Sequence, residues 1–89
     1  MNKHMIINGR VQGVGFRYTA KLKAEEYQLA GWVRNKIDGT VELEVEGNEE
    51  QIDSFVNELR LGLNNFIRVD NIEETISESE KGYNKFFIK

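Results

Sequence analysis

The chain has 89 residues, a length that predicts one small domain over residues 1–89 and leaves no room for a separate cofactor-binding half. It contains no cysteine, which excludes a disulfide scaffold, a thiolate nucleophile and a metal site held by thiolates. The longest apolar runs, such as residues 5–7, have three residues. We therefore expect neither a membrane span nor a secretory signal sequence, and a cytoplasmic location.

The net charge is −3, from 12 basic and 15 acidic residues, which argues against a general nucleic-acid binder. Residues 1–37 contain seven Lys and Arg against two Glu, whereas residues 38–89 contain five Lys and Arg against thirteen Asp and Glu. If a small anion binds to this protein, the asymmetry predicts that it binds in the first third of the chain. An asymmetry of this size also arises by chance on two solvated faces.

Residues 3–11 are expected to form the first strand, because their apolar side chains share one parity. From Phe16 the apolar residues recur at spacings of four, four and three, which is typical of one face of a helix ending near Leu29. Residues 32–37 and 40–46 follow as a second and a third strand, and the third alternates without a fault.

The turn between the second and third strands can be predicted from the same parity. A two-residue loop would pair charged residues with core residues, whereas a loop of residues 37–39 pairs Val33 with Leu43 and ends on a left-handed glycine. The alternation along the third strand also predicts that Glu44 and Glu46 face solvent.

The second half of the chain begins with Asn48, which can cap a helix with four apolar residues on one face, ending near Gly62. Residues 66–76 predict a fourth strand and residues 85–88 a short fifth one. Because a β-α-β unit is right-handed and leaves room for a strand between its parallel members, we predict an α+β fold of the ferredoxin-like βαββαβ type. In this sandwich two helices cover one face of a four- to five-stranded, mainly antiparallel sheet.

The loop between the first strand and the first helix contains two closely spaced glycines, Gly13 and Gly15. They let successive N–H groups point inward, and the helix N-terminus adds unpaired N–H groups and a dipole that favours an anion. Arg17, in the first turn, can add a planar bidentate donor. Two interpretations are open: a phosphate-binding loop, or a tight turn with an exposed arginine.

Asn35 stands at the end of the second strand. In the predicted topology the first and second strands run in the same direction about 10 Å apart, with the third strand between them. Residues 12–17 therefore face Asn35 and its turn, and a phosphate-sized ligand can be reached from both sides. Without a motif, the simpler interpretation of Asn35 is a polar residue that satisfies a strand end.

Residues 11–18, VQGVGFRY, are followed at a fixed interval by residues 31–35, GWVRN, and then by residues 38–42, DGTVE. These motifs resemble the acylphosphatase family, and the similarity covers roughly residues 5–60. The resemblance implies hydrolysis of the carboxyl–phosphate bond of acyl phosphates to a carboxylate and inorganic phosphate. It implies neither a cofactor nor a metal ion.

The resemblance also implies a role for each matching residue. The backbone N–H groups that would bind the phosphoryl group belong to Gly13, Val14, Gly15, Phe16 and Arg17. The Arg17 side chain would bind the same group, and Asn35 would orient the attacking water. Because the carboxylate of an acyl phosphate departs readily, no strong general acid is required, and the protein has to supply alignment and charge stabilisation.

We expect inorganic phosphate to bind as product and competitive inhibitor, and a monomer with no nucleic-acid or membrane partner. His4, the only histidine, is expected at the end of the first strand opposite the loop, away from any chemistry. Two alternatives remain at this point. One is a non-catalytic anion-binding or protein-interaction module with the same fold. The other is an accessory domain handling carbamoyl phosphate, as acylphosphatase-like domains do in hydrogenase maturation proteins.

Overall fold

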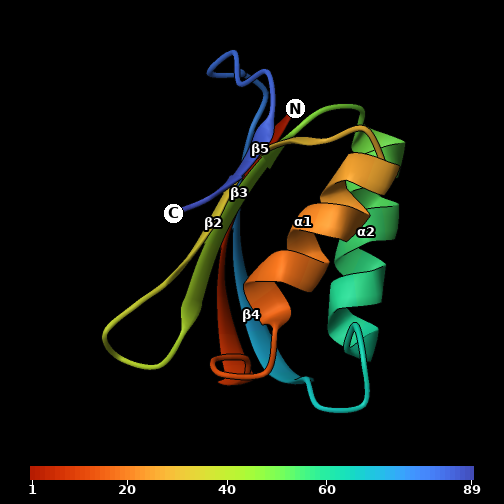
Figure 1. The fold of residues 1–89 in the computed structure, drawn as a ribbon. Coiled ribbons are helices and arrows are strands. Elements are labelled where there is room, and N and C mark those ends of the chain that lie inside the picture. The colour runs from red at the N-terminus through yellow and green to blue at the C-terminus, as the bar shows by residue number, and fades with distance from the viewer.

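The computed structural model describes residues 1–89 and contains five strands and two helices. The elements are β1 (Asn2–Arg10), α1 (Phe16–Glu26), β2 (Ala30–Asn35), β3 (Val41–Glu46), α2 (Glu49–Leu61), β4 (Arg68–Ser77) and β5 (Phe86–Ile88). The two helices lie side by side on one face of the sheet (Figure 1). The predicted order and the ferredoxin-like α+β fold are confirmed. Neither helix is long and apolar enough to cross a membrane.

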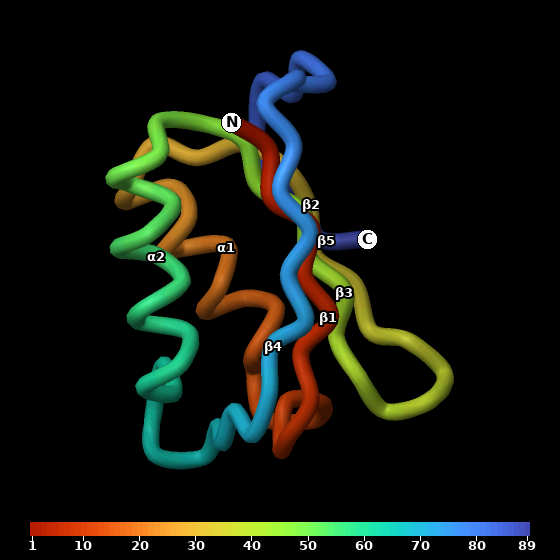
Figure 2. The backbone as a smooth tube through the Cα atoms, turned by 180° about the vertical axis from the view of Figure 1, so that it is seen from behind, coloured from red at the N-terminus to blue at the C-terminus, as the bar shows by residue number.

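The five strands form one sheet in the order β4-β1-β3-β2-β5. All neighbouring strands pair antiparallel except β2 and β5, which are parallel. Because β1 and β2 both pair antiparallel with β3, they run in the same direction with β3 between them. The loop after β1 and the hairpin after β2 consequently lie toward the same end of the sheet, the lower end in Figure 1 and Figure 2.

The hairpin between β2 and β3 has the predicted three-residue loop. Val33 pairs with Leu43 in the register of the two strands. The Lys36 N–H donates a 2.9 Å hydrogen bond to the Thr40 carbonyl, which closes the loop. Gly39 has a φ of +91°, a conformation that glycine adopts without steric cost. Parity along the strands was therefore sufficient to predict this register.

The core lies between the sheet and the two helices. The buried helix residues are Phe16, Ala20 and Ala24 of α1 and Ile52, Phe55, Val56 and Leu59 of α2. Val11 and Phe16 are each 1% exposed and stand at the two ends of the loop between β1 and α1. Fully burying a large apolar side chain stabilises a fold by roughly 1.5–3 kcal/mol. The core therefore holds both ends of this loop, although Gly13 and Gly15 within it are exposed.

Helix α1 ends at Glu26, three residues before the predicted end near Leu29. Gln28 adopts a left-handed conformation with a φ of +59°. The Gln28 N–H donates to the Glu25 carbonyl and the Leu29 N–H donates to the Ala24 carbonyl, at 3.0 and 2.8 Å. These two bonds form a Schellman cap. The end was misplaced because the left-handed residue of such a cap is usually glycine, and here it is glutamine.

Candidate active site

The loop between β1 and α1 depends on the conformation of two glycines. Gly13 has a φ of +74° and Gly15 a φ of +79°. A Cβ atom added at either position would meet no atom within 4 Å. Backbone conformation, and not lack of space, is therefore what favours glycine here. Gly15 is also the N-cap residue of α1, and no side chain caps the helix.

The backbone N–H groups of residues 13–17 donate no hydrogen bond within the protein. The first bond of the helix runs from the Thr19 N–H to the Gly15 carbonyl, at 3.1 Å. The first turn of α1 contains no acidic residue. Unpaired N–H groups at the positive end of a helix dipole are a favourable environment for an anion.

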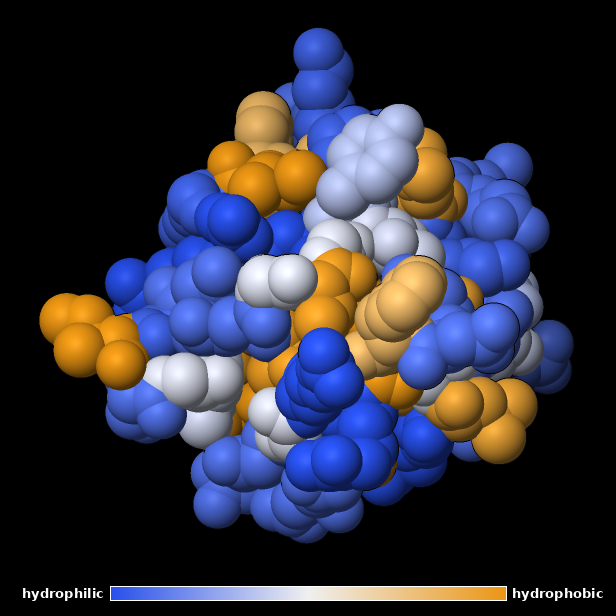
Figure 3. Space-filling view, turned by 60° about the horizontal axis from the view of Figure 1, so that its bottom comes forward, coloured by the Kyte–Doolittle hydropathy of each residue, from blue (hydrophilic) through white to orange (hydrophobic).

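A pocket of about 220 Å³ lies between this loop and the end of β2. It is lined by Val11, Gly13, Gly15, Phe16, Arg17, Tyr18, Asn35 and Ile88. Figure 3 looks onto this end of the molecule, where apolar surface gathers near the middle of the face and is surrounded by hydrophilic residues. The pocket is smaller than those that bind drug-sized ligands, which measure about 300–1,000 Å³.

The structure places most of the sequence-predicted site residues around this one pocket. They are Gly13, Gly15, Phe16, Arg17 and Asn35. Val14 does not line the pocket, because its side chain packs against the core, although its N–H is unpaired. The pairing of two parallel strands with β3 therefore brings the loop and Asn35 together, as the topology predicted.

Arg17 is the only charged residue that lines the pocket. It is half-buried and makes neither an ion pair nor a hydrogen bond with another side chain. Every other arginine except Arg10 pairs with a carboxylate. The guanidinium of Arg17 is thus free to bind an anion with two parallel N–H donors.

Asn35 is the last residue of β2 and pairs with Val41 of β3. Its Oδ1 atom is buried and has no hydrogen-bond partner. Leaving a buried acceptor unpaired costs about 1–3 kcal/mol, so such atoms are uncommon in folded proteins and often belong to functional sites. Asn35 also lines the pocket, and its unpaired carboxamide oxygen keeps its capacity to accept a hydrogen bond.

Sequence reasoning did not identify three residues that line the pocket: Val11, Tyr18 and Ile88. Tyr18 is 62% exposed and follows Arg17 directly on α1. Ile88 is 41% exposed and belongs to β5, which is parallel to β2. The position of Tyr18 next to Arg17 was an available signal. For Ile88 none existed, because strand pairing between distant segments brings it to the pocket.

His4 lies outside this pocket, as predicted. Its Nε2 atom is 2.6 Å from Oε2 of Glu42, and its ring makes an edge contact with Trp32. No three His, Asp or Glu side chains come together in a group that could hold a metal ion. His4 and Glu42 therefore form a hydrogen-bonded pair outside the pocket, and neither residue lines it.

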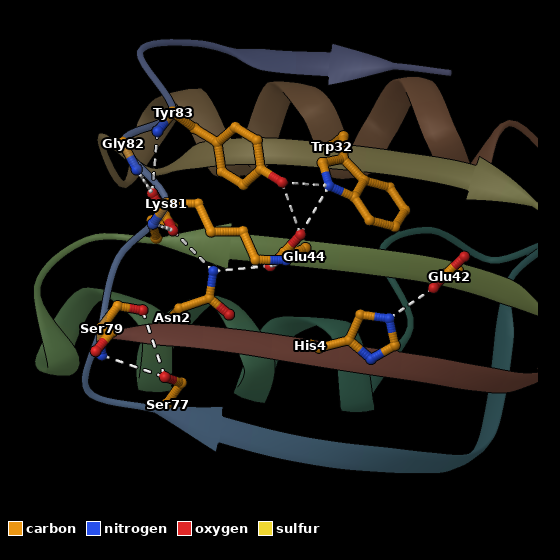
Figure 4. Close-up of polar contacts among 11 residues, drawn as sticks. Asn2, His4, Trp32, Glu42, Glu44, Ser77, Ser79, Lys81, Gly82 and Tyr83 are labelled. Atoms are coloured by element: carbon orange, nitrogen blue, oxygen red, sulfur yellow. Dashed lines mark hydrogen bonds and ion pairs between the residues drawn. The ribbon is translucent and has the colours of Figure 1, made fainter.

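The prediction that Glu44 and Glu46 face solvent is wrong. Their exposed fractions are 2% and 4%, because the connection between β4 and β5 covers the outer face of the sheet at this point. Glu46 accepts hydrogen bonds from the backbone N–H groups of Lys81, Gly82 and Tyr83, the last two at 3.0 Å. Figure 4 shows these groups gathered on one side of the sheet.

Glu44 forms a polar cluster with Asn2, Trp32, Lys81 and Tyr83 on the same face of the sheet (Figure 4). Its carboxylate accepts hydrogen bonds from Asn2 Nδ2 at 2.8 Å and from Tyr83 Oη at 2.9 Å, and it pairs with Lys81 Nζ at 2.9 Å. Burial by itself raises the pKa of this carboxyl. The hydrogen bonds from Lys81, Asn2, Tyr83 and Trp32 outweigh that effect and lower the pKa of Glu44 to about 2. The cluster thus fastens the connection to β5.

Comparisons with protein families and with known sequences both point to acylphosphatases. The family model described as acylphosphatase matches residues 3–88. An acylphosphatase of Bacillus subtilis (strain 168) is 45% identical over 84 residues, which cover 94% of this chain and 91% of that protein. An acylphosphatase of Methanospirillum hungatei is 41% identical over 86 residues, which cover 96% of this chain and 92% of that protein.

Solved structures are similar over nearly the whole chain. The crystal structure of acylphosphatase from Bacillus subtilis superimposes with a TM-score of 0.95 at 43% identity, covering 99% of this chain and 97% of that one. The crystal structure of full-length HypF in the phosphate- and nucleotide-bound form gives a TM-score of 0.86 at 32% identity. This chain corresponds to 11% of the HypF chain, so the same fold also occurs as a small part of a much longer protein.

Proposed function

Because the chain belongs to the acylphosphatase family, we propose that it hydrolyses acyl phosphates by direct attack of water on a phosphoryl group held by the loop between β1 and α1. It is an acylphosphatase, so its substrates are acyl phosphates and its products are a carboxylate and inorganic phosphate. The residues that perform each step are part of the proposal.

The N–H groups of residues 13–17 bind the phosphoryl oxygens. They are unpaired within the protein and lie at the N-terminus of α1. The guanidinium of Arg17 binds the same group with two N–H donors. Together these donors oppose the negative charge on the phosphoryl oxygens, which is the main requirement of phosphoryl transfer. The chain supplies this stabilisation from its own groups, and we propose that no metal ion or cofactor takes part.

The attacking water is oriented by Asn35. Two observations carry this role: Asn35 lines the pocket, and its Oδ1 atom has no hydrogen-bond partner within the protein. As an acceptor it takes a hydrogen bond from the water and directs a lone pair toward phosphorus. An aspartate in its place would add a negative charge opposite an anionic substrate, so a neutral carboxamide suits the role.

The reaction is a single displacement at phosphorus, in which water replaces the carboxylate. The water oxygen forms a bond to phosphorus, and the bond between phosphorus and the acyl oxygen breaks with its electron pair going to the carboxylate. The proton lost by the water passes to solvent or to the phosphate product. Because a carboxylate is a stable leaving group, the pocket needs no acid to protonate it, and none of its lining residues is a carboxylic acid or a histidine.

We propose that residues 1–89 act as one domain and as a monomer in the cytoplasm, without a nucleic-acid or membrane partner. The net charge of −3 supports the exclusion of nucleic acid, since binding to its backbone requires clustered positive charge. Inorganic phosphate is expected to compete with the substrate, because it presents the same oxygens to the same donors.

The proposed roles are tested by comparing Asn35→Ala with Arg17→Ala. If Asn35 orients water, Asn35→Ala lowers kcat for benzoyl phosphate by about 10²-fold or more and leaves the phosphate inhibition constant within a few-fold of the parent value. Arg17→Ala lowers kcat and also weakens the binding of inorganic phosphate. Asn35→Asp should be at least as impaired as Asn35→Ala. Loss of phosphate binding in Asn35→Ala to the same degree as in Arg17→Ala would make the asparagine a phosphate ligand and exclude the water-orienting role.

A further inference from the structure

Gln12 makes two hydrogen bonds that the proposed mechanism does not use. Its Nε2 atom donates to the carbonyl oxygen of Lys36 and to the carbonyl oxygen of Thr40, each at 2.8 Å. Lys36 directly follows Asn35, and Thr40 directly precedes its cross-strand partner Val41. One side-chain amide therefore spans the base of the hairpin loop beside Asn35.

Both carbonyl oxygens already accept a backbone hydrogen bond within the hairpin. The Thr40 carbonyl accepts a 2.9 Å bond from the Lys36 N–H, and the Lys36 carbonyl accepts a 3.2 Å bond from the Gly39 N–H. Gln12 supplies a second donor to each carbonyl. Because Gln12 is half-buried, these bonds are less exposed to competition from water than bonds on the surface.

These bonds are the only hydrogen bonds between residues 11–15 and the hairpin. β1 ends at Arg10, β2 ends at Asn35, and β3 separates the two strands in the sheet. Beyond the strand ends no ladder of backbone bonds fixes the position of the phosphate-binding loop relative to Asn35. Gln12 is the residue before Gly13, so its side chain ties the start of that loop to the end of β2.

We propose that Gln12 is a positioning residue that sets the separation between the phosphate-binding N–H groups and the carboxamide of Asn35. The inference rests on the proposed water-orienting role of Asn35. In-line attack requires the water and the phosphoryl group to be aligned, and a misplacement of about 1 Å can reduce a rate about 10²-fold. Without the two bonds the loop and the hairpin can each keep their own structure while their relative position varies.

The test uses Gln12→Met, which keeps the length of the side chain and removes both donors, and Gln12→Ala as a second variant. We expect kcat for benzoyl phosphate to fall at least about tenfold, with the phosphate inhibition constant within about threefold of the parent value, since the phosphate-binding groups remain. The matched control is Asp38→Ala. It removes the bonds from the Thr40 N–H and hydroxyl to Asp38 Oδ1 in the same hairpin, at 3.0 and 2.6 Å, and leaves the Gln12 bonds in place. Its kcat should stay within about threefold of the parent value.

A double-mutant cycle separates a positioning role from a general structural one. If Gln12 acts through Asn35, adding Gln12→Met to Asn35→Ala should change kcat by less than about twofold, because the partner being positioned is already gone. Independent, multiplying losses in the double variant would overturn the inference. So would parallel losses of kcat and phosphate binding, or a kcat in Gln12→Met close to that of the parent.

The cycle also distinguishes this inference from the proposed function. If Asn35→Ala alone kept the parent kcat, the water-orienting role of Asn35 would be wrong, and the inference about Gln12 would be wrong with it. If Asn35→Ala lost activity as expected and Gln12→Met did not, only the role of Gln12 would be excluded. Thermal unfolding of each variant checks that the measurements refer to folded protein.

Discussion

The indole Nε1 of Trp32 donates a 2.9 Å hydrogen bond to Oε1 of Glu44, and the two residues are direct partners in the register of β2 and β3. Both lie on the face of the sheet opposite the helices, beneath the connection between β4 and β5 (Figure 4). Tyr83 of that connection donates to the same carboxylate oxygen. The bond is therefore part of the cluster that fixes the path of the chain into β5, the strand that places Ile88 at the pocket.

Glu44→Gln should destabilise the protein at neutral pH and reduce its sensitivity to acid. The pKa of Glu44 is lowered from 4.5 to about 2 in the folded protein, so its stabilisation is complete above pH 4.5 and is lost as the pH falls toward 2. A shift of this size corresponds to roughly 3 kcal/mol. Urea unfolding of the parent and the variant between pH 7 and pH 2 measures the difference.

Glu73→Gln is the control for this experiment, since Glu73 is exposed on β4 and makes no ion pair. Its unfolding free energy should follow that of the parent at every pH within about 0.5 kcal/mol. Parallel pH profiles for the parent and Glu44→Gln would contradict the assignment of the acid sensitivity to Glu44.

Arg17→Ala should lower kcat/KM for benzoyl phosphate by about 10²–10³-fold, because removal of one preorganised donor to the transition state typically has this effect. The fold should persist, since Arg17 makes no contact with another charged side chain. Arg17→Lys should restore little activity, because an ammonium group cannot reproduce the planar bidentate donor. Arg10→Ala is the control: this arginine is exposed and does not line the pocket. Near-parental turnover in a well-folded Arg17→Ala would refute the role.

Inorganic phosphate should inhibit competitively and raise the unfolding temperature. A ligand present at 100 times its dissociation constant stabilises the folded state by about 2.7 kcal/mol. Treatment with EDTA should change neither activity nor stability, because in the proposed mechanism the donors are N–H groups of the chain. Activity that EDTA removed and Mg²⁺ or Zn²⁺ restored would contradict the metal-free mechanism.

Gly15→Ala should lose phosphate affinity as well as stability. Its φ of +79° lies in the left-handed region, where an L side chain costs roughly 1–2 kcal/mol. Gly82→Ala is a matched control, because Gly82 has a φ of +84°, has equally open space for a Cβ, and lies far from the pocket in the β4–β5 connection. Phosphate titration monitored by thermal unfolding should show weaker binding for Gly15→Ala alone. Equal phosphate affinity in the two variants would contradict this prediction, because it would show that anion binding does not depend on the conformation of Gly15.

The sequence by itself determined the order of the elements, the register of the β2–β3 hairpin and the neighbourhood of Arg17 and Asn35. These features follow from local rules. Apolar parity decides which side of a strand meets the core, and a shift of one residue would turn Val33 and Leu43 toward the wrong face. The parallel direction of β1 and β2 follows from the helix between them, which returns the chain to the end of the sheet where β1 began.

Only the tertiary structure decided the surroundings of Glu44, Ile88 and the Gln12 side chain. Alternation along β3 separates two faces of the sheet, but it does not indicate whether a later segment covers the second face, so Glu44 was wrongly expected in solvent. The acceptors of Gln12 are carbonyl groups, which every residue carries, and no side-chain pattern marks them. Contacts between segments far apart in the chain depend on where the whole backbone passes, and for this reason they appear only when the fold is complete.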